Sequence, residues 1–164
     1  MIWFGPAGNS NSFYDQGFSH SWQMPEWLSD MGLNAYEYQC NKGVNLKDET
    51  AQEIGEKAKE AGIRLSVHAP YYINLSSTEQ EKRDNSVKYI LDTLRVAKIM
   101  GADRIVVHPG YVSKITRKTA VELAKAILLE TVKKADDAGF SDITICPEVL
   151  GKNNQLGNLY EVME

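Results

Sequence analysis

Apolar and polar residues are arranged along the chain in a pattern that predicts strands and helices in turn. Short apolar runs typical of strands lie at residues 2–5, 35–38, 63–67, 104–107 and 143–146. Apolar residues spaced three or four positions apart predict helices at residues 25–31, 48–61, 78–100 and 120–138, and one more helix beginning near Asn158. A chain in which strands and helices alternate forms a parallel sheet with helical connections. The sequence therefore predicts an α/β fold.

The predicted helices carry recognisable end signals. Thr78 and Glu81 have the spacing of a capping box at the start of the longest helix. Gly62, Gly101 and Gly139 follow helical segments at the position of a C-terminal cap. These signals support the boundaries drawn from the apolar pattern.

The number of predicted strands limits the architecture. A (β/α)8 barrel of the TIM type has eight strands and typically about 250 residues, whereas this chain has 164 residues and about five predicted strands. It is therefore either a small open sheet or the front part of a barrel, and the end of the sequence within a new helix favours the barrel. We expect residues 1–164 to form the N-terminal part of a single (β/α)8 barrel domain. Such a partial barrel exposes sheet edges and apolar helix faces, which favours self-association.

Three side chains that bind metals follow three successive predicted strands. They are His68, His108 and Glu148, and they are separated by two equal intervals of 40 residues. The carboxyl ends of parallel strands meet at one edge of a sheet, roughly 5 Å apart, so these side chains are expected to converge. Two imidazoles and one carboxylate suit zinc, with manganese or iron as alternatives. The alternative to a metal site is a purely structural role for the two histidines.

The loops beyond these strands contain further candidates. Tyr71 and Tyr72 follow the first histidine, where they would either stack on a base or sugar or cover the barrel mouth. A basic cluster, Lys114, Arg117 and Lys118, follows the second histidine and is interpreted as a solvated helix start rather than a phosphate contact. The third histidine, His20, lies in a loop-like stretch and is expected to face solvent.

Composition excludes several classes of protein. The net charge of −4 argues against a protein that coats nucleic acid by bulk positive charge, but a bound metal ion would add charge that this sum omits. No apolar run approaches the 18 residues that favour a membrane span, and the N-terminus does not resemble a signal peptide. Cys40 and Cys146 form no disulfide framework and no zinc motif, and we expect both to be reduced. We therefore expect a cytoplasmic protein that does not associate with membranes.

Three segments of the sequence resemble endonuclease IV, the zinc-dependent apurinic/apyrimidinic endonuclease family of the xylose-isomerase-like barrel superfamily. The segments are residues 67–75, 107–110 and 147–157. In the first segment, the pattern His-x-x-Tyr-x-Ile-Asn-Leu is fairly specific, whereas the His-Pro-Gly of the second is not. By this resemblance the chain corresponds to roughly the first 60% of such a protein.

The resemblance implies a function and a set of roles. It implies a site for up to three zinc ions in the complete protein, in which His68 and His108 bind one ion and Glu148 bridges it to another and acts in catalysis. The implied reaction is metal-assisted hydrolysis of a phosphodiester at an abasic site, with damaged double-stranded DNA as the partner. Tyr71, Tyr72 and Lys152 are the implied DNA contacts, and this chain alone is expected to be inactive on DNA.

Two positions depart from the pattern of the family. Ala69 replaces the Asp that commonly follows the first histidine, and Val149 replaces the Asn that commonly follows the bridging glutamate. These differences bear on abasic-site specificity more than on metal binding. A sugar isomerase or epimerase of the same superfamily, using one divalent metal ion, is therefore the second functional hypothesis, and a metal-free binding module is the third.

Overall fold

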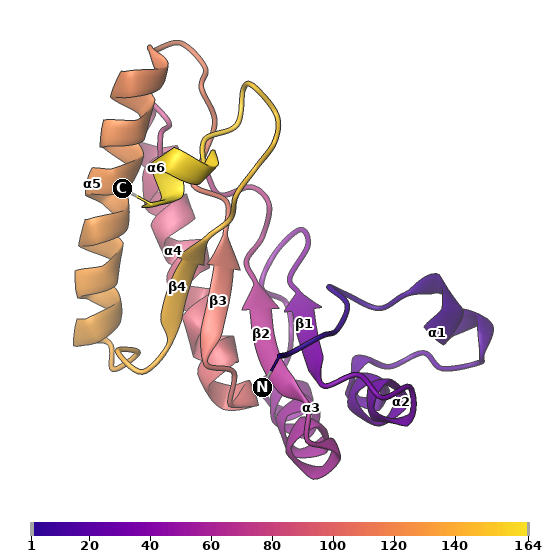
Figure 1. Ribbon diagram of the computed structural model, residues 1–164. Coiled ribbons are helices and arrows are strands. Elements are labelled where there is room, and N and C mark those ends of the chain that lie inside the picture. Colours follow the sequence, from indigo (N-terminus) through magenta and orange to yellow (C-terminus); the bar gives the residue numbers. More distant parts are fainter. Residues whose placement is uncertain (1, 164) are drawn as a thin grey trace.

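The computed structural model describes residues 2–163 and contains a parallel sheet with helical connections (Figure 1). The strands are β1 (Ala35–Gln39), β2 (Arg64–His68), β3 (Arg104–Val107) and β4 (Thr144–Pro147), and they lie side by side in this order. The helices are α1 (Asn11–Asp15), the 3-10 turn η1 (Ser21–Gln23), α2 (Met24–Asp30), α3 (Asp48–Ala61), α4 (Gln80–Met100), α5 (Arg117–Asp137) and α6 (Leu159–Met163). The predicted α/β class with a parallel, partial barrel-like sheet is confirmed.

The two faces of the sheet have different surroundings. Leu65, Val67, Ile105 and Val107 are at most 5% exposed, and they lie on the face that packs against the helices. Figure 1 shows α4 behind the sheet, where it contacts β2 and β3. Because side chains alternate along a strand, Ser66 and the other residues between these positions project from the opposite face, which is only partly covered. In a barrel this second face lines the interior.

The segment at residues 2–5 is not a strand, so the sheet has four strands among the described residues rather than the five predicted. The segment still follows the free edge of β1. Phe4 and Pro6 accept hydrogen bonds from the N–H groups of Ala35 and Glu37 at 3.0 and 3.1 Å. Gly8 then donates to the carbonyl of Glu37 at 2.8 Å. Pro6 has no N–H group, so it cannot donate to β1, and the ladder remains too incomplete to form a regular strand.

Helix boundaries were predicted with mixed success. Helix α3 has the predicted bounds, and Gly62 and Gly101 cap α3 and α4 in the left-handed conformation. The capping box at Thr78 and Glu81 is absent because α4 begins two residues later, at Gln80. There Ser77 Oγ accepts a hydrogen bond from the N–H of Glu79 at 3.2 Å.

Two other helix starts follow local side-chain hydrogen bonds. The short helix α1 was not predicted, and its N-cap residue Ser10 accepts a hydrogen bond from the N–H of Phe13. Helix α5 begins three residues earlier than predicted because Thr116 caps it by accepting from the N–H of Thr119. In both cases one hydroxyl accepts a hydrogen bond from an amide of the first turn and helps to fix the start of the helix.

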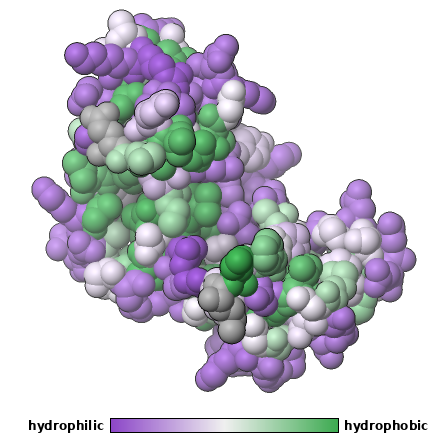
Figure 2. Space-filling model, viewed as in Figure 1, coloured by the Kyte–Doolittle hydropathy of each residue, from purple (hydrophilic) through white to green (hydrophobic). Residues whose placement is uncertain are grey.

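Apolar side chains are exposed at the β4 end of the sheet. Figure 2 shows hydrophobic residues gathered over β4, α5 and α6. Leu129 on α5 is 58% exposed, and Leu159 and Met163 on α6 are 57% and 76% exposed. An apolar hollow of about 210 Å³ lies between these two helices and the loops beside β4. Within residues 2–163, no helix combines the length and apolar character needed to cross a bilayer.

Candidate metal centre

The carboxyl ends of three adjacent strands bring His68, His108 and Glu148 together. His68 is the last residue of β2, and the other two directly follow β3 and β4. The ligand atoms that these three residues offer all lie within 4.8 Å of one another. This separation is small enough for all three to reach a single cation.

Glu148 contacts both imidazoles with the same oxygen atom. Its Oε2 lies 3.0 Å from Nε2 of His68 and 2.9 Å from Nε2 of His108. The two imidazole rings are 5.1 Å apart and nearly perpendicular, with an angle of 89° between their planes. The three polar tips therefore point at one centre from three strands.

A backbone carbonyl determines which nitrogen of His68 carries a proton. Nδ1 of His68 lies 2.8 Å from the carbonyl oxygen of Ala69, and a carbonyl only accepts hydrogen bonds. Nδ1 is therefore the protonated nitrogen, which leaves the lone pair of Nε2 facing Glu148 when the ring is neutral. A lone pair next to a carboxylate oxygen is unfavourable unless a proton or a cation lies between them. In histidines that bind metals, the ring nitrogen that does not bind the metal typically donates a hydrogen bond to a carbonyl or carboxylate, as Nδ1 of His68 does here.

Burial favours the neutral form of His108. Desolvation is the main reason that the pKa of His108 is lowered from its usual value, and the nearby His68 lowers it further while Glu148 opposes the shift. A neutral imidazole is the form that binds metals. Nδ1 of His108 is buried and has no hydrogen-bond partner among the described residues. Within this part of the chain, the ring therefore makes its polar contact through Nε2, with Glu148.

Backbone hydrogen bonds continue the sheet at Glu148 and at Ala69, next to His68. The N–H of Ala69 donates to Val106 at 2.8 Å, and the N–H of Glu148 donates to Val107 at 2.9 Å. Prolines lie close to all three ligands: Pro109 and Pro147 are adjacent to His108 and Glu148, and Pro70 lies two residues after His68. Each proline restricts the backbone where a strand ends and a loop begins. The side chains are therefore held by the sheet rather than by mobile loops.

The donor set fits a zinc ion. Two imidazole nitrogens and one carboxylate oxygen are the three protein ligands typical of a catalytic zinc site, which keeps a further position open. The side chains of His68 and His108 are 14% and 15% exposed, whereas Glu148 is 37% exposed. The cluster is thus sheltered on the imidazole side and accessible on the carboxylate side.

The predicted DNA contacts lie on loops beyond the strand ends. Tyr71 and Tyr72 are 42% and 51% exposed, their rings are 4.3 Å apart, and the two hydroxyls are 3.0 Å apart. Lys152 is exposed on the loop after β4. The structure therefore pairs the two tyrosines with each other, and it places Lys152 on a different loop.

In the basic cluster at the start of α5, Lys114 and Lys118 are exposed, as expected, whereas Arg117 is only partly exposed and is hydrogen-bonded. Arg117 donates hydrogen bonds to both carboxylate oxygens of Glu161 in α6, at 2.6 and 2.9 Å, and to the carbonyls of Asn153 and Gln155. Arg117 therefore ties the loop after β4 to α5, which the sequence pattern did not indicate. His20 is exposed, as expected.

Neither cysteine takes part in the centre. Cys40 and Cys146 are free thiols, as expected, and burial raises the pKa of Cys40 to about 12. A thiol with so high a pKa stays protonated at neutral pH and is a poor nucleophile and a poor metal ligand.

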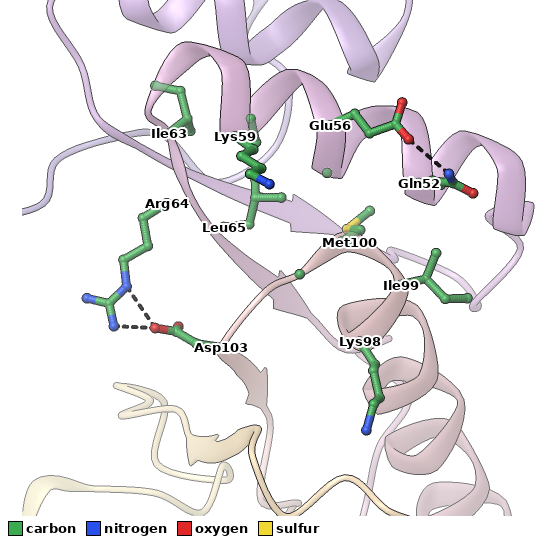
Figure 3. A pocket seen from close by; sticks show the side chains of 13 residues that line it. Gln52, Glu56, Lys59, Ile63, Arg64, Leu65, Lys98, Ile99, Met100 and Asp103 are labelled. Atoms are coloured by element: carbon green, nitrogen blue, oxygen red, sulfur yellow. Dashed lines mark hydrogen bonds and ion pairs between the residues drawn. The ribbon is translucent and has the colours of Figure 1, made fainter.

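A second hollow lies at the opposite end of the sheet, near the starts of β2 and β3 (Figure 3). It has a volume of about 400 Å³, and several of the polar side chains that line it are hydrogen-bonded to one another. Arg64 is bonded to Asp103, and Glu56 accepts a hydrogen bond from Gln52 at 2.9 Å. Functional groups in barrels of this kind gather at the other end, so we assign this hollow a structural role.

Comparison with known proteins places the chain in a family. A sequence profile described as "Xylose isomerase-like TIM barrel" matches residues 25–164. The chain belongs to the xylose isomerase-like TIM barrel family. The expected superfamily is thus confirmed, and it is a family in which endonucleases and sugar epimerases share one fold.

Individual relatives extend this result. The chain is 30% identical to "Uncharacterized protein MJ0133" of Methanocaldococcus jannaschii, over 100% of this chain and 57% of that protein. It is 33% identical to "Probable endonuclease 4" of Acholeplasma laidlawii, over 67% of this chain and 38% of that protein. Among solved structures, a D-tagatose 3-epimerase-like protein superposes with a TM-score of 0.68 at 24% identity, over 85% of this chain and 54% of that one.

The shared length is partial in every one of these comparisons. The chain spans between 38% and 57% of the length of these three proteins. Four parallel strands in sequential order, with helices on one face, are what half of an eight-stranded barrel contains. The fold and the family are therefore established, whereas the reaction depends on the site.

Proposed function

We propose that this chain carries one metal site of a zinc-dependent endonuclease that hydrolyses a DNA phosphodiester at apurinic/apyrimidinic sites. The observation that carries the proposal is the convergence of His68, His108 and Glu148 within 4.8 Å at the carboxyl ends of β2, β3 and β4. The similarity to the endonuclease 4 of Acholeplasma laidlawii supports the choice of DNA as substrate.

The two histidines and the glutamate of the site would have different roles in the reaction. A zinc ion held by His68, His108 and Glu148 would supply Lewis-acid stabilisation of a phosphate oxygen and would lower the pKa of water. Both imidazoles contact Oε2 of Glu148, so its Oε1 would be the oxygen that reaches a second metal ion or orients a water molecule. The two histidines contribute no charge when neutral, so the carboxylate is the one anionic ligand of the three and would offset part of the charge of the cation.

Surface residues near the site suit a nucleic acid. Tyr71 and Tyr72 present two exposed aromatic rings on the loop that follows His68, and aromatic rings stack on bases or insert at a kinked step. Lys152 offers a positive charge on the loop that follows Glu148. With a net charge of −4, the chain needs such local contacts and the metal charge to hold a phosphate backbone.

An incision assay tests the proposal. The substrate is a duplex oligonucleotide with one abasic site, and the enzyme is a complete barrel that contains this chain, loaded with zinc. We expect incision that is abolished by a chelator and by His68→Ala, and no incision by residues 1–164 alone because half of the barrel is missing from them. Chelator-resistant incision, or intact substrate with the zinc-loaded complete barrel, would contradict the proposal.

The same preparation distinguishes a sugar isomerase or epimerase. A zinc- or manganese-loaded barrel that interconverts small ketoses and leaves abasic DNA intact would select that function instead. The His68→Ala variant is informative in both assays, because loss of the metal ligand should abolish whichever reaction the metal supports.

A further inference from the structure

The turn that follows His108 is hydrogen-bonded to the loops on both sides of it. Its residues 109–111 come from β3, whereas the loops that contact it come from β2 and β4. The N–H of Leu75 donates to the carbonyl of Pro109 at 3.3 Å, and the N–H of Leu156 donates to the carbonyl of Gly110 at 2.9 Å. The loops that carry the three metal ligands are thus joined through this turn.

Two polar side chains from the β2 loop make the most direct contacts with the turn. The N–H of Tyr111 is directed at Oδ1 of Asn74 and at Oγ of Ser76, each at 3.1 Å. The hydroxyl of Ser76 lies 2.8 Å from the carbonyl of Tyr111, to which it donates, and 2.9 Å from Oδ1 of Asn74. Ser76 is fully buried, so that these hydrogen bonds form where water does not compete.

The shape of the turn makes this contact specific. Gly110 has a φ of +138°, a conformation that other residues rarely adopt. A Cβ atom at this position would lie 2.6 Å from Oγ of Ser76 and 2.7 Å from Oδ1 of Asn74. The backbone therefore approaches the two polar side chains as closely as a glycine permits, and the position of His108 two residues earlier is fixed with it.

We propose that Asn74 and Ser76 are positioning residues of the metal centre: they hold the turn after β3 so that Nε2 of His108 faces Oε2 of Glu148. The inference rests on the metal site of the proposed function. Neither residue contacts the ligands themselves, so their effect on metal binding is transmitted through the backbone of residues 109–111. The sequence pattern alone did not indicate this role, because the contact joins positions more than 30 residues apart.

Cobalt(II) binding to residues 1–164 tests the inference, because the visible absorption of cobalt reports both affinity and ligand geometry. Asn74→Leu keeps the size of the side chain but removes the acceptor for Tyr111. We expect it to weaken cobalt binding by about 10- to 100-fold, as loss of an indirect support of a metal ligand commonly does, and to change the spectrum. Asn74→Asp keeps the oxygen acceptor and should restore the spectrum of the unmodified chain.

A matched control separates positioning from general destabilisation. Thr131 in α5 is also fully buried, and its hydroxyl donates a hydrogen bond within the same helix, to the carbonyl of Ile127 at 2.7 Å. Thr131→Val should therefore leave cobalt affinity and spectrum unchanged. Should Asn74→Leu fail to fold, Ser76→Ala provides the second variant, with the same expected loss.

The outcomes are distinguishable. Weaker binding in Asn74→Leu or Ser76→Ala, with unchanged binding in Thr131→Val, supports the positioning role. Unchanged cobalt affinity and spectrum in folded Asn74→Leu and Ser76→Ala would overturn it and leave the proposed metal site intact. An unmodified chain that binds no cobalt would overturn the metal site, and the positioning role with it.

Discussion

Two individual atoms decide how the candidate centre works: Nδ1 of His68, which is engaged by the carbonyl of Ala69, and Oε2 of Glu148, which both imidazoles approach. The residue after the first histidine supports His68 through its backbone carbonyl, which any residue at this position would supply. This explains how Ala69 can replace the Asp common in endonuclease IV sequences without removing support from His68.

Replacement of Tyr71 tests the DNA contact at the residue scale. We expect Tyr71→Ala in the complete, zinc-loaded barrel to weaken binding to abasic duplex DNA by about tenfold, because loss of one stacking contact commonly costs 1–3 kcal/mol. Fluorescence anisotropy with a labelled duplex measures the change. Tyr160→Ala is the control, since Tyr160 is another exposed tyrosine, at 83%, but belongs to α6 rather than to the β2 loop. If Tyr71→Ala and the unmodified protein bind the duplex with equal affinity, Tyr71 does not contribute to DNA binding.

The site residues were predictable from the sequence to different degrees. His68, His108 and Glu148 were predicted because a residue at the end of a strand keeps its place whenever the strand is found, and the strands are strongly apolar. The roles of Asn74 and Arg117 were not predicted, because each depends on contacts with residues more than 30 positions away. No local pattern records which loops will meet.

Among the secondary-structure elements, α6 is held in place by a charged contact. Glu161 accepts hydrogen bonds from Arg117, and also from the N–H groups of Gly157 and Asn158 at 2.9 and 3.0 Å. Arg117 is the main reason that the pKa of Glu161 is lowered from its usual value. These bonds close the loop that begins at Glu148, and so they connect a short helix to the metal centre.

The lowered pKa of Glu161 predicts a pH dependence. Its ionised form is stabilised in the folded chain, so this contribution is present above the ordinary carboxyl pKa of about 4.5 and is lost as the pH falls through the lower folded value. We expect Glu161→Gln to reduce the free energy of unfolding by about 1–2 kcal/mol at pH 7. Urea unfolding at several pH values measures it. The difference from the unmodified chain should shrink as the pH falls below 4.5, and a constant difference would contradict the assignment.

Elements were predictable where local signals and packing agreed. Helix α3 has its predicted bounds because its apolar side and its capping residue Gly62 mark the same segment. Residues 2–5 have a strand-like composition, but Pro6 interrupts the hydrogen bonds that a strand needs. The start of α4 was misplaced because Ser77, rather than Thr78, provides the hydroxyl next to the first turn.

At the scale of the whole molecule, the sheet has two free sides with exposed apolar residues. Ile2 and Phe4 are 72% and 64% exposed beside β1, and Leu159 and Met163 are 57% and 76% exposed at the β4 end. In an eight-stranded barrel both sides would be covered by further strands and helices. The chain by itself leaves them open to solvent.

We expect residues 1–164 to self-associate through these surfaces when no other part of a barrel covers them. Sedimentation velocity over a range of concentrations should show dimers or larger species. The double variant Leu129→Lys with Leu159→Lys should shift the distribution towards monomer, because two charges would be buried in the contact. A chain that stays monomeric at every concentration would contradict this prediction, because it would show that these surfaces do not mediate self-association.

The central claim is that two imidazoles and one carboxylate bind one cation, and X-ray absorption spectroscopy of the zinc-loaded chain tests it most directly. The account predicts a zinc ion with two imidazole nitrogens and a carboxylate oxygen among its ligands, and loss of that signal in His68→Ala and in His108→Ala. A zinc environment without imidazole, or zinc binding that is unchanged in both variants, would contradict it.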